Sequence, residues 1–236
     1  MGNSSGLKVK FITGGSYGDL YGVDFMKDEE GKIIVNPKNG QPFKEEGQAN
    51  KYLGNMNAKY NLGWHNTFNY KDFQFYFLID GKIGGKVISF TEAYLDYYGV
   101  SERSAESRLN AERNNLLFTN KSGETSLGML LPDGQMVAVE GYYTKTGGAN
   151  PLGTNYVYNG TNFRLREISA GYTFRNLFGA TKHLTVSVNA RNLFFIYKDA
   201  PIDPETSLTT QNALGNVDIF SMPTTRSFGV SIKATF

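Results

Sequence analysis

Hydrophobic and polar residues alternate strictly over the last stretch of the chain, residues 227–236. Every second residue there is apolar: Phe228, Val230, Ile232, Ala234 and Phe236. The residues between them are small or polar, and successive side chains of a β-strand point to opposite faces. The pattern therefore predicts a strand with one wholly apolar face and one polar face. Such a strand fits between lipid and an aqueous lumen, as in a transmembrane β-barrel.

A β-hairpin is predicted over residues 62–80, because two alternating runs meet there across a short turn. Apolar side chains occupy even positions before the turn and odd positions after it: Leu62, Trp64, Phe68, Tyr70, Phe73, Phe75, Phe77 and Ile79. A two-residue turn at 71–72 sets Tyr70 opposite Phe73 and places both runs on one face. Asn66 is the one polar residue expected among them.

A second hairpin is predicted between residues 163–174 and 184–197, where apolar and polar residues alternate again. The alternation slips at Arg166–Glu167, and Asn192 marks a similar limit in the other strand. A slip of one residue indicates a β-bulge or the boundary of the membrane.

The remaining segments are predicted to hold shorter elements. Residues 90–98 favour a helix capped by Thr91, which residues 101–109 continue after Gly99. Residues 8–21 are predicted as a strand, and residues 32–35 and 41–43 as a hairpin around Asn39–Gly40. Short turns and the C-terminus fall at one end of the predicted strands and long loops at the other, as in barrels with periplasmic turns and extracellular loops.

The composition is compatible with this interpretation and excludes several functions. Aromatic residues make up 14% of the 236 residues, and 27 are glycine, a mixture suited to β-structure with many turns. A net charge of +2, from scattered basic residues, argues against nucleic-acid binding. There is no cysteine, which excludes disulfides and thiolate metal sites. The mean hydropathy of −0.38 does not exclude a barrel, since only alternate strand residues face lipid.

No motif for catalysis or metal binding stands out. The two histidines, His65 and His183, lie far apart in sequence, and no Gly-x-Ser-x-Gly motif precedes a helix. The acidic stretches at 28–30 and 199–205 lack the spacing of a calcium loop, and residues 81–86 lack the Gly-Lys-Ser/Thr ending of a phosphate loop and a following helix in register. We therefore predict no enzymatic activity, no bound metal and no cofactor.

Four segments of the chain resemble segments of a known protein family. They read Gly14-Gly-Ser-Tyr-Gly-Asp-Leu-Tyr-Gly22, Asn162-Phe-Arg-Leu-Arg-Glu-Ile-Ser-Ala-Gly-Tyr-Thr-Phe174, Ala190-Arg-Asn-Leu-Phe-Phe-Ile-Tyr-Lys-Asp-Ala-Pro-Ile-Asp-Pro-Glu205 and Met222-Pro-Thr-Thr-Arg-Ser-Phe-Gly-Val230. Together they resemble the C-terminal portion of SusC/RagA-type TonB-linked outer-membrane transporters of Bacteroidetes. The resemblance runs in the family's order from about residue 14 to residue 236.

The resemblance implies a 22-stranded barrel in the cell outer membrane, closed by an N-terminal plug. Members of the family import glycan or peptide fragments with energy coupled through TonB, beneath a SusD-like surface lipoprotein. Residues 1–236 resemble only the last six to eight strands of such a barrel, with a short helix in a loop and with plug, TonB box and signal peptide absent. The implied partners are the lipid bilayer, the remainder of the same barrel and plug, the SusD-like lipoprotein, TonB through the missing N-terminal part, and the barrel-insertion machinery, which would read Phe236 as a terminal aromatic signal.

Two groups of side chains are predicted to contact a solute or the lipoprotein. Tyrosines gather in or beside the long loops, where they can stack on sugars, pack on a capping protein or form an aromatic girdle: Tyr94, Tyr97, Tyr98, Tyr142 and Tyr143. Arg164 and Arg166 lie within a predicted strand, and a lipid-facing arginine costs about 2–4 kcal/mol at the bilayer midplane. We expect both to face the lumen or to lie above the membrane, lining a solute path or forming ion pairs that fix the barrel wall.

Two other interpretations stay open at the level of sequence. The first is a small self-contained barrel acting as a pore or adhesin, for which eight strands are the usual minimum. The second is a soluble β-sandwich that binds carbohydrate, in which Phe73, Phe75, Phe77 and Phe228 would form the core. A sandwich needs a second sheet over these side chains, whereas a barrel leaves them exposed in a belt.

Overall fold

The structure, a computed structural model, describes residues 6–45, 49–175, 183–206 and 216–235. The chain divides into two compact units. The sheet unit comprises residues 57–85, 159–206 and 222–236, and the helical unit comprises residues 1–56, 86–158 and 207–221. The described residues are mostly strand with few helices, as the sequence predicts.

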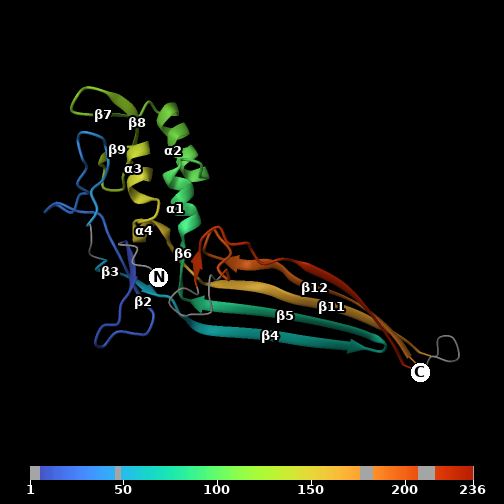
Figure 1. Cartoon of the computed structure of the whole chain (residues 1–236). Coiled ribbons are helices and arrows are strands. Elements are labelled where there is room, and N and C mark those ends of the chain that lie inside the picture. Colours follow the sequence, from blue (N-terminus) through green and yellow to red (C-terminus); the bar gives the residue numbers. More distant parts are fainter. Residues whose placement is uncertain (1–5, 46–48, 176–182, 207–215, 236) are drawn as a thin grey trace. The chain divides into compact units, whose positions relative to one another are not determined.

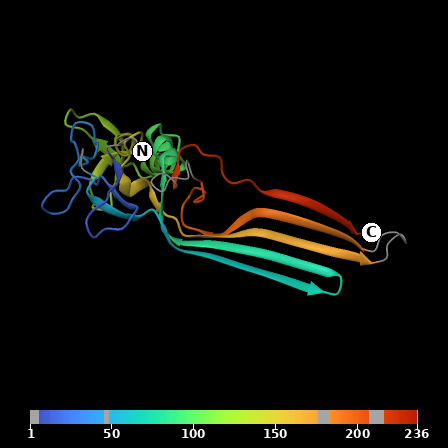
Figure 2. The same cartoon turned by 60° about the horizontal axis from the view of Figure 1, so that its bottom comes forward.

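The sheet unit is built on one antiparallel sheet with the strand order β14-β12-β11-β5-β4. Figures 1 and 2 show these long strands running side by side. Their bounds are β4 Ala58–Tyr70, β5 Phe73–Gly84, β11 Asn162–Arg175, β12 His183–Lys198 and β14 Ser227–Thr235. The 71–72 turn and the ends of β11 and β14 lie at one end of the sheet, and the long connections leave from the other.

The register of the sheet places apolar side chains on one face of all five strands. Val230 pairs with Val188, which pairs with Ala170, and the row continues through Phe75 to Phe68. Directly paired residues point to the same side of a sheet. The apolar face consists of Trp64, Phe68, Tyr70, Phe73, Phe75, Phe77, Ile79, Ile168, Ala170, Tyr172, Phe174, Leu184, Val186, Val188, Ala190, Phe228, Val230, Ile232 and Ala234.

The apolar face is exposed rather than covered by a second layer. The exposed fraction is 77% for Phe228, 70% for Val230, 53% for Val188 and 59% for Trp64. A sandwich core requires a facing sheet about 10 Å away, and the sheets found among the described residues leave these side chains open. The soluble-sandwich interpretation therefore lacks the covering layer that it needs.

The opposite face of the same sheet is polar. One row across it reads Ser231, Ser187, Gly171, Gln74 and Asn69 from β14 to β4. A sheet with an exposed apolar face and a polar face has the side-chain distribution of a barrel wall between lipid and water. The described residues do not close into a barrel, and they contribute five strands to the sheet, where six to eight were expected.

Both predicted hairpins form with the expected pairing. Tyr70 lies opposite Phe73 across the 71–72 turn, where Lys71 takes a φ of 54°. The predicted slip at Arg166 is a β-bulge, because Arg166 has no paired residue in either neighbouring strand. Asn192, with a φ of 54°, lies in the matching irregularity of β12.

The N-terminal strand prediction was wrong in its extent. Residues 8–21 do not form one strand, because the chain turns between β1, Leu7–Val9, and β2, Asp19–Gly22. The Asp19 carboxylate accepts a hydrogen bond of 2.7 Å from the Ser16 amide and closes this turn. Around Asn39–Gly40 the predicted turn is present, but its arms meet through an isolated bridge at Val35 and Pro42 and not through regular strands.

The helical unit holds four helices and three small sheets among its described residues. The helices are α1 Phe90–Tyr97, α2 Glu102–Arg113, α3 Val139–Thr146 and α4 Gly153–Tyr156. The sheets are β1-β2-β3, β10-β6-β13 and β7-β8-β9, in which β3 is Lys51–Asn55, β6 Lys86–Ser89, β7 Leu117–Thr119, β8 Thr125–Leu130, β9 Met136–Ala138, β10 Val157–Asn159 and β13 Val217–Asp218. In the part of the chain that the structure describes, no helix is long and apolar enough to cross a membrane.

The first two helices are separate, which corrects the single helix that the sequence suggested. The Ser89 hydroxyl, and not that of Thr91, caps α1 by accepting a hydrogen bond of 3.1 Å from the Glu92 amide. Gly99 ends this helix with a φ of 68°, a conformation that favours glycine. Ser101 then caps α2 through the Ser104 amide at 3.1 Å.

Candidate functional site

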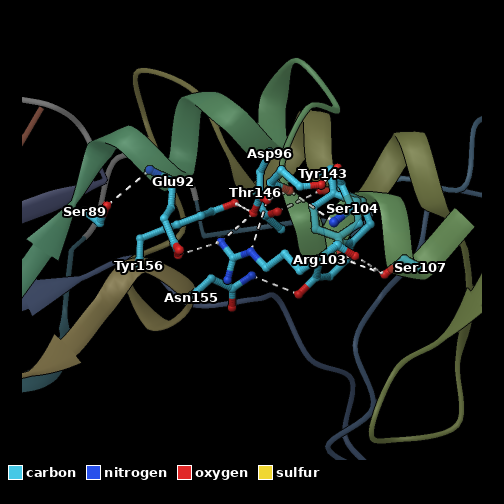
Figure 3. Close-up of polar contacts among 12 residues, drawn as sticks. Ser89, Glu92, Asp96, Arg103, Ser104, Ser107, Tyr143, Thr146, Asn155 and Tyr156 are labelled. Carbon is cyan, nitrogen blue, oxygen red and sulfur yellow. Dashed lines mark hydrogen bonds and ion pairs between the residues drawn. The ribbon is translucent and has the colours of Figure 1, made fainter. Parts of the chain in front are cut away.

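An ion pair between a buried carboxylate and a partly exposed arginine joins the first two helices of the helical unit. Asp96 lies near the end of α1 and is 1% exposed, and Arg103 lies in the first turn of α2. The turn at Gly99 brings the two side chains together: Arg103 Nε is 3.1 Å and Arg103 Nη2 2.5 Å from the Asp96 carboxylate (Figure 3). This two-point contact fixes the angle between the helices.

The Asp96 carboxylate accepts hydrogen bonds from several donors. Besides Arg103, it accepts hydrogen bonds from the Ser101 hydroxyl at 2.5 Å and from the Tyr156 hydroxyl at 2.7 Å. The Arg103 guanidinium lies 4.8 Å from the centre of the Tyr156 ring. A buried charge is tolerated only when it is paired and hydrogen-bonded, and this arrangement meets both requirements.

Further hydrogen bonds connect this ion pair to the other helices. The Tyr143 hydroxyl of α3 donates to the Arg103 carbonyl at 3.1 Å and lies 2.8 Å from Ser107 Oγ in α2. The Tyr158 hydroxyl donates to the Glu92 carboxylate, and Arg103 lies 3.4 Å from the same hydroxyl. The helices are therefore held by one continuous polar network around Arg103.

The network is not arranged for proton transfer near neutral pH. Burial, reinforced by the charge of Asp96, raises the pKa of the Tyr156 hydroxyl. Burial and the hydrogen bond to Glu92 likewise raise the pKa of Tyr158. Burial opposes the charge on Arg103, but hydrogen bonding to Asp96 outweighs it and raises the pKa of the guanidinium. These tyrosines therefore keep their protons and Arg103 keeps its charge near neutral pH, which maintains the hydrogen bonds and the ion pair of the network.

Two adjoining hollows lie beside this network. One, of about 280 Å³, is lined by residues of α1, α2 and α3, including Asp96, Tyr97, Tyr98 and Tyr143. The other, of about 510 Å³, extends over the turn at 38–41 and β8. Both are lined by Arg108, Val139, Glu140 and Thr144, and we call the combined hollow the Arg108 cleft.

The structure brings three of the five predicted tyrosines to the Arg108 cleft. Tyr97 and Tyr98 are 43% and 70% exposed, and their rings are perpendicular with centroids 5.2 Å apart. Tyr143 contributes to the cleft but is otherwise buried. Tyr94 packs instead against the core around Ile88, and Tyr142 packs against the cluster around Val139, with its hydroxyl accepting from Asn155 at 2.9 Å.

The two predicted arginines of the sheet unit form ion pairs at its bulge. Arg164 is 3% exposed, and its Nη1 lies 2.8 Å from Glu205 and 3.8 Å from Asp203. Arg166 contacts Asp80 at 2.7 Å and Glu205 at 2.5 Å. The pairs fasten the segment after β12 to the polar face, which matches one of the two roles expected for these arginines, while contact with a solute stays a prediction.

The acidic partners of these arginines are held in their charged form. Burial raises the pKa of Glu205, but the hydrogen bond and charge of Arg166 outweigh it and leave the pKa below its usual value. For Asp203 the same cost of burial is outweighed by hydrogen bonds from Thr224 and from the Glu205 amide. The segment therefore stays fastened at neutral pH.

Sequence reasoning missed the residues that organise the helical unit. Asp96, Arg103, Arg108 and Glu140 were not singled out; the only signal was Ser101 as a helix cap two residues before an arginine. Phe236, the predicted assembly signal, lies outside the described residues. Among the residues that the structure describes, no group of three or more acidic or histidine side chains is placed to hold a metal ion.

Comparison with known proteins identifies similar folds but no close relative. No protein-family model matches the chain, and no curated protein sequence matches it. Chains from structures of the RagAB peptide importer are similar in the closed-closed state (TM-score 0.54, 12% identity, 93% of this chain and 24% of that chain) and in the open-open state (TM-score 0.56, 11% identity, 98% and 24%). A chain from a structure of the RagAB peptide transporter is similar with a TM-score of 0.54 and 13% identity, over 93% of this chain and 24% of that chain.

At this level of identity the similarity concerns the fold. The chain spans about a quarter of the length of the solved chains that it matches, and nearly all of its own length takes part in the match. The chain thus has the fold of one part of a transporter chain.

Proposed function

We propose that this chain forms a section of the barrel wall and several extracellular loops of an outer-membrane, TonB-dependent importer. In this proposal the sheet unit stands in the membrane, with its apolar face toward lipid and its polar face toward the lumen. The helical unit belongs to the loops on the extracellular side. The transported solute is a peptide or glycan fragment, and the chain itself has no catalytic role.

The observation that carries the proposal is the exposed apolar face of the sheet. Its 19 side chains come from five strands in one continuous register, none of them is buried, and many of the large ones are exposed in the described structure. Soluble proteins rarely expose an apolar patch of this extent. The strands also have the length that a tilted strand needs to cross a bilayer, about 9–11 residues.

The similar solved structures support the same proposal. Their descriptions name a peptide importer, and the matched region covers 93–98% of this chain, so both units lie within the match. By analogy, the remaining barrel strands, a plug, a SusD-like surface lipoprotein and TonB would act with this chain. The self-contained barrel is less well supported, because the described residues supply five strands and closure usually takes at least eight.

Epitope insertion tests the proposed orientation. A short tag after Ser122, in the exposed turn between β7 and β8, should be reached by antibody on intact cells. The matched insertion between Lys71 and Asp72, in the turn between β4 and β5, should be reached only after the outer membrane is permeabilised. Tags equally accessible on intact cells, or recovery of the untagged protein in the soluble fraction, would contradict the proposal.

A further inference from the structure

We infer that the Arg108 cleft binds a short extended peptide that carries both an acidic and a basic group. In this inference Arg108 receives the acidic group and Glu140 the basic one. The inference rests on the proposed function, because it names the class of solute that the extracellular loops would take from the medium.

Arg108 has no carboxylate within 4.0 Å among the residues that the structure describes. Among the described residues, the other partly buried arginines, Arg103, Arg164 and Arg166, all form ion pairs with acidic side chains. Arg108 is half-buried in the cleft, and its hydrogen bonds run to the Gly99 carbonyl at 2.9 Å and to Ser104 Oγ at 3.5 Å. A guanidinium has five N–H donors in a planar fork that suits a carboxylate. Donors are therefore left over for a ligand.

An acidic side chain borders the same cleft. Glu140 is exposed in the first turn of α3 and lines both hollows together with Arg108. No ion pair within 4.0 Å joins Arg108 and Glu140 among the contacts of the described residues. Lys38 and Glu124 line the larger hollow as well, so the cleft presents groups of both signs, and Arg108 and Glu140 are the charged pair that borders both hollows. Each of the two can meet an opposite charge on one ligand.

The remaining lining of the cleft fits a peptide backbone and its side chains. The Gln41 amide and the Ser126 hydroxyl border the larger hollow and can both donate and accept hydrogen bonds. Leu127 and Val139 supply apolar surface beside them. Most of the residues that line the larger hollow are polar or charged, as suits a ligand with a polar backbone, and the two hollows, at about 280 and 510 Å³, fall in or near the usual size range of ligand pockets.

These features favour a peptide over a neutral glycan. A neutral sugar would bring no charge to Arg108 or Glu140 and would leave both groups partly desolvated without compensation. The perpendicular rings of Tyr97 and Tyr98 also do not form the coplanar platform on which a sugar chain would lie flat. A peptide supplies carboxylate, ammonium or guanidinium groups and backbone amides on one chain.

The support below the cleft is rigid, which favours selective binding. Asp96 and Tyr143 line the smaller hollow and also belong to the hydrogen-bonded network around Arg103. A site whose supporting side chains are locked by neighbouring hydrogen bonds loses less entropy when it binds. The network thus holds α1, α2 and α3 together and sets the backbone positions from which Arg108 and Glu140 project.

Isothermal titration of the detergent-solubilised full-length protein tests the inference. The probes are the hexapeptide Ala-Glu-Ala-Ala-Lys-Ala, the same peptide with glutamine in place of glutamate, and maltohexaose. We expect Arg108→Gln to weaken binding of the first peptide about ten-fold or more, the effect of losing one charge-assisted hydrogen bond. The glutamine peptide should bind the original protein and the Arg108→Gln variant with similar affinity. Glu140→Gln should weaken binding of both peptides, because both carry the lysine.

The controls separate the cleft from the fold. Arg113→Gln, at the exposed end of α2, removes the same charge outside the cleft and should leave the affinity unchanged. An unchanged affinity in Arg108→Gln, an equal loss for both peptides, or preferential binding of maltohexaose would overturn the inference. The epitope-tag experiment distinguishes failure of this inference from failure of the proposed function. If the tags show the proposed orientation but the peptides bind without the expected preference, only the peptide site in the Arg108 cleft is rejected. If the tags show the wrong orientation, the proposed function is rejected.

Discussion

Val230→Arg is expected to destabilise the protein in a lipid bilayer by about 2–4 kcal/mol, the cost of an arginine on the lipid face near the midplane. Val230 lies near the middle of β14, on the apolar face, and is 70% exposed. In the proposed orientation this exposure is to hydrocarbon, in which a guanidinium loses its hydration. Urea titration of the protein in lipid vesicles, followed by the shift between folded and unfolded bands on a gel, measures the change.

Ser231→Arg provides the matched control for this prediction. Ser231 is the next residue of the same strand and lies on the polar face, opposite Ser187. An arginine there points toward the lumen and should change stability by less than about 0.5 kcal/mol, as exposed substitutions usually do. Equal effects at the two positions would show that the two faces meet the same environment, and the lipid-facing assignment would then be wrong.

Arg103→Ala is expected to destabilise the helical unit by about 1–3 kcal/mol, because it removes the cation beside a buried carboxylate. The Arg103 side chain is itself 37% exposed, so water replaces part of the lost contact. Asp96 is 1% exposed and would retain only the hydroxyls of Ser101 and Tyr156 as donors. The loss of the guanidinium also removes its contacts with the Tyr156 ring and the Tyr158 hydroxyl. Protease susceptibility of the helical unit over a urea gradient measures this loss.

Two further variants separate the ion pair from a general loss of charge. Arg113→Ala removes an exposed arginine from the same helix and should lie within about 0.5 kcal/mol of the original protein. The double variant Arg103→Met with Asp96→Leu removes the carboxylate together with its cation and should recover part of the stability, since ion pairs of this kind are often replaceable by apolar residues. The recovery is partial because the buried Tyr156 hydroxyl loses its acceptor. A double variant as unstable as Arg103→Ala would mean that packing, and not the unpaired charge, causes the loss.

The sheet unit is the part of the fold that sequence reasoning could reach. Its strands alternate in hydrophobicity with a period of two, and the pairing of the hairpin at 71–72 follows from the lengths of two neighbouring runs. Even the bulge at Arg166 appeared as a slip in the alternation. Each of these features depends on residues close together in sequence, so a local pattern is enough to specify it.

The helical unit depends on contacts that no local pattern reveals. The Asp96 carboxylate accepts a hydrogen bond from Tyr156, which lies 60 positions away in sequence. Arg108 and Glu140 look like ordinary surface residues of two amphipathic helices until the fold places them around one hollow. The arginines of the sheet unit show the same limit, because Glu205, the common partner of Arg164 and Arg166, lies about 40 positions away.

The most direct test of the account is an accessibility scan along β14. The chain contains no cysteine, so single cysteines at positions 227–234 can each carry a spin label at a known site. With the protein in lipid vesicles, we predict a period of two: labels at 228, 230, 232 and 234 collide with membrane-dissolved oxygen, and labels at 227, 229, 231 and 233 collide with a water-soluble nickel complex. Uniform access to the nickel complex at all eight positions would contradict the assignment of this sheet to the membrane.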